Sequence, residues 1–392
     1  MLHPWLEPYF AQFVAALRQG RLPNSVIISG VEGLGGNELA LAMAQYYLCH
    51  DPKEHGPCGV CRSCAAFKRL MHQDLKVAYT STADEADNEL DFTYDCSGLI
   101  ARSEPTGASR RTMRIDTMRK ITDFLNESPV LGGRGKVVII SGAESMLVGA
   151  ANAILKTFEE PSPNSLILMV TKSLESLLPT ILSRATKMVL RDVPTDLALG
   201  FLLNPANQQP VVIRRVDDED GSAYLQEAEE ARAKCPGLAQ PITPPRAEIA
   251  LALNSSAPLS AMRMLLDGTD LKAIAVVQQL INAIMGGDRF GNGVIQALKD
   301  LPKPLQGRLF SELILEILKY KAYVEVSQLP LIKYAGPNPE QTAQILMRLQ
   351  CDHLFDAMDK LRYIEDRPPL IPARAPQAIV RAWLKAFSAD LA

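Results

Sequence analysis

Short apolar runs alternate with segments of helical periodicity from the N-terminus to about position 190 of the chain. The runs are apolar or β-branched at nearly every position, as in parallel strands that helices cover on both faces. Between them, apolar residues recur at three- and four-residue spacings, which predicts helices with one buried face. The pattern predicts strands over 25–29, 75–80, 136–141, 166–170 and 186–190, and helices over 36–48, 116–127, 147–159 and 178–184. Strands and helices in this order favour an α/β domain with a mostly parallel sheet.

The pattern changes after position 190, where strand-like runs fade. Residues 204–246 hold a run of acidic residues and a cluster of prolines, which favours a solvated, variable insertion over a specific binding element. From position 247 to the C-terminus, apolar residues recur with helical spacing. We therefore expect a small helical domain over 191–268, which carries the insertion, and a larger helical domain over 269–392.

Composition narrows the class of protein. A chain of 392 residues with 47% hydrophobic and 22% charged residues is long enough for two or three domains with ordinary cores. Its formal net charge of -3 does not indicate a strongly basic nucleic-acid binder. The sequence has no apolar run long enough to cross a bilayer, and its start, "MLHPWLEPYF", lacks the basic and apolar regions of a signal peptide. We expect a cytoplasmic protein with no membrane span.

A glycine-rich turn lies between the first predicted strand and the helix that follows. Gly30 and Gly35 keep the glycine spacing of the phosphate-binding loop G-x-x-x-x-G-K-[ST]. Gly36 stands where the lysine belongs, and Asn37 stands where the serine or threonine belongs. The lysine would supply charge to the β- and γ-phosphates and the hydroxyl would coordinate Mg²⁺. The loop therefore has the glycines of a nucleotide site without its charged and metal-binding side chains.

The acidic motif that should accompany such a loop is also absent. The strand over 136–141 ends in Ser141 and Gly142, where a nucleotide hydrolase has Asp-Glu, and Glu144 comes too late to replace them. Two independent losses argue against hydrolysis, so we expect no productive ATP/Mg²⁺ site. From these residues alone, a second interpretation stays open, in which the glycines only make a tight turn.

Four cysteines cluster between positions 49 and 64, with the spacing C-x₈-C-x₂-C-x₂-C: Cys49, Cys58, Cys61 and Cys64. Two C-x-x-C steps bring several thiolates to one ion, and four sulfur ligands are typical of structural Zn²⁺. An iron–sulfur cluster is the chemical alternative, and four reduced thiols are the third possibility. We interpret His55 and His72, which lie nearby, as bystanders.

Five stretches before position 190 carry a family resemblance. They read "HPWL" at 3–6, "GRLPNSVIISG" at 20–30, "IDTMRKI" at 115–121, "GKVVIISGAESMLVGAANAILKTFEEP" at 135–161 and "LLPTILSRA" at 177–185. Together they resemble the delta-prime subunits of bacterial DNA polymerase III clamp loaders, which belong to the AAA+ class. The resemblance covers about positions 1–190, and beyond them it rests on the domain plan.

This resemblance implies a RecA-like AAA+ domain over 1–190 with a zinc module at 49–64, a helical lid over 191–268 and a helical collar over 269–392. In this family five subunits join through their collars, and the complex opens a sliding clamp and places it on primed DNA. Delta-prime members often have a degraded nucleotide site, so the resemblance implies a non-hydrolysing scaffold within the DNA polymerase III holoenzyme and no independent ATPase. The implied partners are the delta and tau/gamma subunits, with the clamp and primed DNA reached through the complex.

The resemblance also implies a catalytic role in trans. In the family a Ser-Arg-Cys motif brings an arginine to the ATP of the neighbouring subunit, and here the motif reads Ser183, Arg184, Ala185. A guanidinium carries a permanent charge suited to a γ-phosphate. The alternative is an arginine paired with a carboxylate at a helix end, but the flanking "LLPTILSR" favours the arginine finger. In the lid, Leu259 stands where the family's ATPases have an arginine.

Two other functions compete with this hypothesis. One is an active ATPase of the tau/gamma type, against which Gly36, Ser141 and Gly142 count. The other is a zinc-containing nucleic-acid-binding adaptor outside replication, against which the long match at 135–161 counts. A basic run, "SRRTMR" at 109–114, is more typical of a solvated face than of a DNA contact. We interpret Trp5 as a packing residue.

Overall fold

The computed structural model of the chain describes residues 2–69, 71–80, 92–93, 112–210, 222–284, 291–334, 338–366, 380, 381 and 384. Its contacts divide the chain into two compact units. The N-terminal unit comprises Met1–Val193 and Val211–Glu230, and the C-terminal unit comprises Pro194–Pro210 and Ala231–Ala392. The further division of the second unit into a lid and a collar stays a prediction.

A mostly parallel sheet forms the centre of the N-terminal unit. Its strands are β1 (Ser25–Ser29), β2 (Leu75–Ala78), β3 (Phe92–Thr93), β4 (Lys136–Ser141), β5 (Ser165–Thr171) and β6 (Thr186–Val189). The order across the sheet is β3-β2-β4-β5-β1-β6. Every neighbouring pair is parallel except β2 with β3. The predicted α/β class is confirmed, although the sequence pattern did not indicate the two-residue β3.

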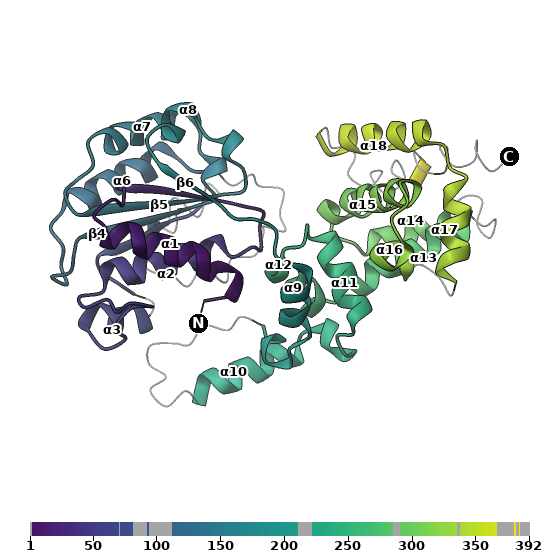
Figure 1. Cartoon of the computed structure of the whole chain (residues 1–392), viewed down its shortest axis with the longest axis horizontal. Coiled ribbons are helices and arrows are strands. Elements are labelled where there is room, and N and C mark those ends of the chain that lie inside the picture. The colour runs from purple at the N-terminus through teal and green to yellow at the C-terminus, as the bar shows by residue number, and fades with distance from the viewer. Residues whose placement is uncertain are drawn as a thin grey trace. The chain divides into compact units, whose positions relative to one another are not determined.

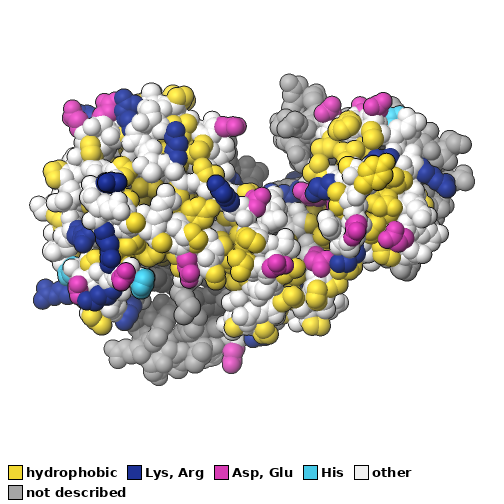
Figure 2. Space-filling model, in the orientation of Figure 1, with side chains coloured by type: hydrophobic (Ala, Val, Ile, Leu, Met, Phe, Trp, Pro, Cys, Tyr) yellow, Lys and Arg dark blue, Asp and Glu magenta, His cyan; other side chains and the backbone are white. Residues whose placement is uncertain are grey.

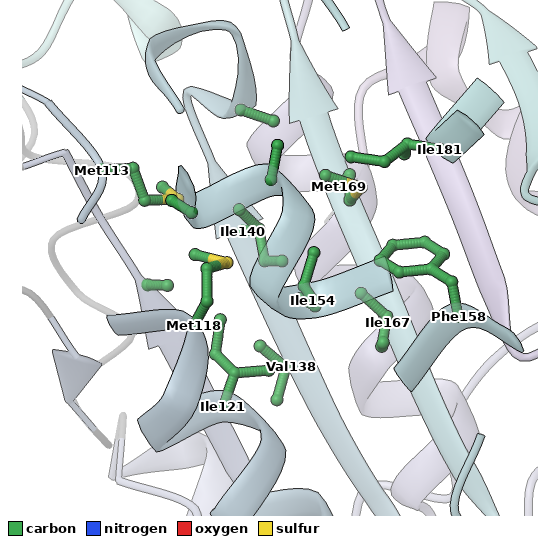
Figure 3. Packing of buried hydrophobic residues seen from close by; sticks show 14 of the residues in the cluster. Met113, Met118, Ile121, Val138, Ile140, Ile154, Phe158, Ile167, Met169 and Ile181 are labelled. Atoms are coloured by element: carbon green, nitrogen blue, oxygen red, sulfur yellow. The ribbon is translucent and has the colours of Figure 1, made fainter. Parts of the chain in front are cut away.

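Helices cover both faces of this sheet (Figure 1). On one face lie α6 (Ile115–Asn126), α7 (Val148–Glu159) and α8 (Pro179–Leu182), and on the other lie α1 (Glu7–Arg18) and α2 (Gly36–Leu48). The short helix α3 (Arg62–Lys68) follows α2. Figure 3 shows apolar side chains from α6, α7 and the strands meeting in one core, among them Met118, Ile121, Val138, Ile140, Ile154, Phe158 and Ile167. Burial of both faces explains why the strands are apolar at successive positions.

The strand predicted over 186–190 departs from that rule. In β6 only Met188 is buried, and the other three residues are exposed. The reason is its place at the edge of the sheet, where it pairs with β1 alone. The expectation that helices bury both of its faces is therefore wrong.

In the described residues after Val193, all regular structure is helical. The helices are α9 (Thr195–Leu203), α10 (Ser222–Ala233), α11 (Pro244–Leu253), α12 (Pro258–Leu266), α13 (Thr269–Ile284), α14 (Asn292–Lys299), α15 (Lys303–Lys321), α16 (Pro330–Lys333), α17 (Pro339–Met347) and α18 (Cys351–Asp366). Among the described residues, no helix combines the length and the apolar character that crossing a membrane requires. Charged side chains of both signs are interspersed over the face that Figure 2 shows.

A buried ion pair organises the start of the C-terminal unit. Arg246 of α11 donates from Nε to Asp270 Oδ2 at 2.6 Å and from Nη2 to Asp270 Oδ1 at 3.1 Å. The side chains of Arg246 and Asp270 are 6% and 0% exposed. The same guanidinium donates to the carbonyls of Gly237, Gln240 and Leu265. One side chain therefore joins the segment before α11 to the end of α12 and the start of α13.

This network corrects one expectation from the sequence. The composition of 204–246 favours a solvated insertion, yet its last residues, from Gly237 to Arg246, include buried positions and the centre of this network. The acidic stretch at 217–220 lies outside the described residues. Prolines indicate an irregular segment, but they do not exclude burial when a guanidinium satisfies the free carbonyls.

We expect Arg246→Met to destabilise the C-terminal unit by about 3–5 kcal/mol, because it leaves the Asp270 carboxylate buried without a partner. Chemical denaturation of the full chain measures this change. The matched control is Arg232→Met, which alters an exposed arginine of α10 and should change stability by less than about 0.5 kcal/mol. A loss below about 1 kcal/mol for Arg246→Met would show that the network does not hold the unit together.

Candidate functional site

The glycine-rich turn lies at the carboxyl edge of the parallel sheet, between β1 and α2. Gly35 has φ +99°, in the left-handed region that favours glycine, and it directly precedes the first helical residue, Gly36. The strand, turn and helix thus occur where the sequence predicts them. In nucleotide-binding folds, this is the place where backbone N–H groups at a helix start meet a phosphate.

The interior of the turn is packed with apolar side chains. Leu34 and Leu6 are 1% and 0% exposed, and Trp5 Nε1 donates to the Leu34 carbonyl at 2.8 Å. A Cβ atom on Gly35 would lie 2.7 Å from Leu6 Cδ1. The residues before α1 therefore fix the shape of the turn, and Trp5 has the packing role that the sequence indicated.

Gly36 and Asn37, which occupy the lysine and hydroxyl positions of the loop, make other contacts in this structure. A Cβ atom on Gly36 would lie 3.0 Å from Val170 Cγ1 of β5, so a side chain here would require Val170 to shift by a few tenths of an ångström. Asn37 Oδ1 accepts a hydrogen bond from Ser141 Oγ at 3.0 Å. In a hydrolase the positions of Asn37 and Ser141 would carry the hydroxyl and the acid that hold the metal. Here they bond to each other.

A charged cluster at the mouth of the turn was not found from the sequence. Lys172, just after β5, forms an ion pair with Glu32 of the turn at 2.8 Å. The backbone N–H of Lys172 donates to Glu144 Oε2 at 3.2 Å. These residues come from three loops, and the only signal in the sequence is that each follows the end of a strand.

The four cysteines predicted as metal ligands come together. Their sulfur atoms lie within 4.8 Å of one another. The distances are 3.9 Å from Cys49 to Cys61, 3.9 Å from Cys58 to Cys64 and 3.7 Å from Cys49 to Cys64. A tetrahedron of sulfurs about 2.3 Å from a central ion has edges of about 3.8 Å. The spacing is therefore that of a four-thiolate metal site, and a disulfide would need about 2.05 Å.

Backbone N–H groups surround these sulfurs. The N–H groups of Cys58, Cys61 and Cys64 donate to the sulfurs of Cys49, Cys58 and Cys61 at 3.2, 3.4 and 3.4 Å. The N–H groups of Val60 and Cys61 lower the pKa of Cys58 to about 6, whereas burial raises the pKa of Cys64 to about 12. Metal ligation requires thiolates, so binding an ion would release protons from this cluster. The arrangement can hold a metal ion.

A buried polar network anchors the cysteine module to the sheet. His72 Nε2 lies 2.9 Å from Ser63 Oγ, and its Nδ1 accepts from the N–H of Asp74 at 3.1 Å. Asp74 Oδ1 and Oδ2 in turn accept from the N–H groups of Val130 and Leu131. Burial lowers the pKa of His72 to about 4.

Neither nearby histidine joins the group of possible ligands. His55 is exposed, and the cluster of described metal-binding side chains consists of the four cysteines alone. His72 instead ties α3 to the segment that leads into β2. The sequence offered no signal for that role.

Arg184 lies just after α8, on the exposed side of the N-terminal unit. Its Nη2 lies 2.7 Å from Glu159 Oε1, and its Nη1 donates to the Thr180 carbonyl at 2.9 Å and to Ser183 Oγ at 3.2 Å. The Arg184 side chain is 35% exposed. The carboxylate pairing that the sequence left as an alternative is thus present in the isolated chain. Within the described residues nothing accepts from Nε, so the guanidinium is not saturated.

The structure also describes Leu259 and part of the basic run at 109–114. Leu259 lies half-buried in the first turn of α12. The first half of the basic run at 109–114, residues 109–111, lies outside the described residues. Neither location assigns a role.

The fold and the turn together define the class of protein. It is an α/β protein whose first strand runs through a glycine-rich turn into a helix at the carboxyl edge of a parallel sheet, the geometry of nucleotide-binding domains. The turn and the end of β4 lack the side chains that bind Mg²⁺ and nucleotide phosphates in hydrolases.

Comparison with known proteins finds similar sequences among the subunits of DNA polymerase III. The family model described as "DNA polymerase III, delta subunit" matches residues 6–194. DNA polymerase III subunit delta' of Escherichia coli is 32% identical over 200 residues, which are 51% of this chain and 52% of that protein. The subunit delta' of Pseudomonas aeruginosa is 25% identical over 353 residues, 88% of each chain. The chain is therefore similar to the delta-prime subunits of DNA polymerase III.

These matches differ in extent. The match to the Escherichia coli protein spans about half the length of that relative, whereas the Pseudomonas match extends into the helical C-terminal unit. A DNA polymerase III subunit gamma/tau of Mycobacterium bovis is 28% identical over 207 residues, 53% of this chain and 31% of that protein. Over about half of its length in each case, the chain is therefore similar to both kinds of subunit.

We expect Gly36→Lys to lower the free energy of unfolding by about 1 kcal/mol and to leave Mg²⁺-ATP binding undetectable. The new Cβ would crowd Val170, and Asn37 would still bond to Ser141. Denaturant titration and calorimetric titration with Mg²⁺-ATP measure the two effects.

The matched double variant is Gly36→Lys with Val170→Ala, which should recover stability without gaining ATP binding. Micromolar binding by Gly36→Lys alone would mean that a missing charge is the sole defect of the turn.

Proposed function

We propose that this chain is the delta-prime subunit of a replicative clamp loader, a ring scaffold that does not hydrolyse ATP and that supplies an arginine finger to a neighbour. Its partners are delta and tau/gamma subunits, and the complex loads a sliding clamp onto primed DNA. The similarity to delta-prime subunits supports the place in the DNA polymerase III assembly. The hydrogen bond between Asn37 and Ser141 is the observation that carries the non-hydrolysing part.

That hydrogen bond occupies the two positions at which a hydrolase holds Mg²⁺. The ion pair between Lys172 and Glu32 lies at the mouth of the same turn. Lys172 balances the charge of Glu32, so the carboxylate of Glu144 leaves this cluster net negative, which disfavours a polyphosphate. The chain keeps the backbone of a phosphate loop and uses its polar side chains to hold the loop closed on the sheet.

An active ATPase of the tau/gamma type is the second candidate, because a gamma/tau subunit is among the relatives. That similarity covers a domain that both kinds of subunit share. The side chains at Gly36, Asn37 and Ser141 favour delta-prime over the ATPase.

Arg184 is the group through which this chain acts on a neighbour's ATP. It is partly exposed, some of its N–H donors have no acceptor among the residues that the structure describes, and its ion pair with Glu159 lies at the surface. A surface pair of this kind contributes only about 0–1 kcal/mol. Such a small contribution lets a γ-phosphate, which bears more charge, engage the same guanidinium. Ser183 holds the side chain by accepting from Nη1.

The four cysteines hold one structural Zn²⁺ in this proposal. The tetrahedral sulfur spacing supports zinc, and four protein ligands leave no open coordination position for catalysis. The ion would stabilise a loop module that has little apolar core of its own, and the network of His72 and Asp74 attaches that module to the sheet.

The purified chain is expected to carry about one zinc per molecule, and Cys58→Ser should lose most of it. The thermal midpoint of the variant should fall by roughly 10 °C, because loss of a structural metal removes several kcal/mol. Elemental analysis and calorimetry measure these quantities. Cys351→Ser, at an exposed cysteine outside the cluster, is the control. Iron with visible absorption, or no metal at all, would contradict the zinc assignment.

Arg184→Ala should reduce ATP hydrolysis by the reconstituted loader, in the presence of clamp and primed DNA, at least tenfold, about 1.4 kcal/mol of barrier. The control is Arg119→Ala, at another exposed arginine paired with a carboxylate, Asp116 at 2.9 Å. Size-exclusion chromatography must show intact complexes in both cases. Unchanged turnover in an intact complex would reduce the role of this chain to scaffolding.

A further inference from the structure

The contact between α7 and the residue after α8 suggests a role for a side chain that the family motif does not assign. Glu159 is the last residue of α7, and its Oε1 lies 2.7 Å from Arg184 Nη2. The Glu159 side chain is 49% exposed. An ion pair this exposed adds little to stability. Its main effect is on the orientation of the Arg184 guanidinium.

The main chain at Arg184 is already fixed. Its N–H donates to the Ile181 carbonyl at 3.1 Å, and its carbonyl accepts from Ser25 Oγ, at the start of β1, at 3.0 Å. Ser25 is 4% exposed, so this anchor belongs to the buried sheet. What remains free at Arg184 is the long side chain, whose rotamers must be restrained before it can meet a phosphate in one geometry.

Three contacts supply that restraint. Nη1 is held by the Thr180 carbonyl and by Ser183 Oγ, and Nη2 is held by Glu159. The first two come from α8 and the residue that ends it, and only the third comes from another helix. Without Glu159, the guanidinium could rotate about the Nη1 contacts, so Glu159 decides where the remaining donors point.

These contacts leave part of the guanidinium available. Arginine has five N–H donors. The two hydrogen bonds from Nη1 and the ion pair at Nη2 leave Nε–H and at least one N–H of Nη2 without an acceptor among the described residues. A carboxylate that competed with the phosphate would be expected to take both donors of one edge of the fork. One contact on one nitrogen instead orients the group and keeps donors available for a second anion.

We propose that Glu159 is a positioning residue for Arg184, which orients the guanidinium toward the γ-phosphate of the neighbouring subunit's ATP. This inference rests on the proposed function of Arg184. Orienting a catalytic group before the transition state forms raises the turnover number and leaves substrate binding almost unchanged. The predicted signature is therefore a change in kcat for ATP hydrolysis without a change in KM.

The experiment measures kcat and KM for ATP in the complete reconstituted loader with clamp and primed DNA. It compares the unaltered chain with Glu159→Ala, Glu159→Gln, Arg184→Ala and the double variant Glu159→Ala/Arg184→Ala. The control is Glu160→Gln, at the neighbouring exposed carboxylate. Thermal unfolding of each chain separates a positioning role from a merely structural one.

We expect Glu159→Ala to lower kcat by about three- to tenfold with KM unchanged, since small misplacement of a catalytic group has effects of this size or larger. Glu159→Gln should retain most of the activity, because its amide places an acceptor oxygen of similar reach beside Nη2. Removing Glu159 from the Arg184→Ala chain should change nothing further, because the residue acts through Arg184. The thermal midpoint of Glu159→Ala should match that of Glu160→Gln.

The outcomes that overturn the inference are distinct from those that overturn the proposed function. If Arg184→Ala leaves kcat unchanged, the arginine finger is wrong and the positioning role falls with it. If Arg184→Ala lowers kcat and Glu159→Ala does not, only the positioning role is wrong. A rise in kcat for Glu159→Ala would mean that the carboxylate restrains the finger, and a further loss in the Arg184→Ala background would mean that it acts elsewhere. Both results would overturn the inference.

Discussion

The close approach of α2 to the sheet is the constraint on which the N-terminal unit depends. No side chain fits at Gly36 without moving Val170, so the first turn of the helix lies directly against β5. This approach brings Asn37 within hydrogen-bond distance of Ser141 at the end of β4. The far end of the same helix leads into Cys49, so its placement also sets the start of the cysteine module. The glycine that replaces the lysine at position 36 is therefore also the residue that lets α2 pack closely against β5.

The parallel sheet explains why the glycine-rich turn and Arg184 lie at different places in this unit. The carboxyl ends of β1, β4 and β5 bring the glycine-rich turn, Ser141 and Lys172 to one edge, and there the polar groups satisfy one another. Arg184 lies just before the start of β6, and its carbonyl accepts from Ser25 at the buried start of β1. Its side chain is 35% exposed and is paired with Glu159.

Sequence periodicity was sufficient for most of this fold and failed where its physical basis is weak. Strands β1 and β4 match their predicted bounds, because both are buried on both faces and their apolar runs are unbroken. The apolar run at 186–190 did not indicate that β6 lies at the edge of the sheet, because an apolar strand can pair on one side or on two. Helices α1 and α3 were not predicted at all, and the burial of Arg246 within a proline-rich segment was missed because it depends on partners distant in sequence.

The sequence by itself determined the α/β class, the glycine spacing of the turn, the absent lysine and acid, and the cysteine spacing of a metal site. These are properties of local periodicity and of residue identity at short separation, which need no knowledge of the rest of the chain. Only the tertiary structure decided that Asn37 meets Ser141, that Lys172 meets Glu32, and that Glu159 holds Arg184. Each of these pairs joins residues from different strands or helices, and their meeting is fixed by strand order and helix packing, which one-dimensional patterns do not encode.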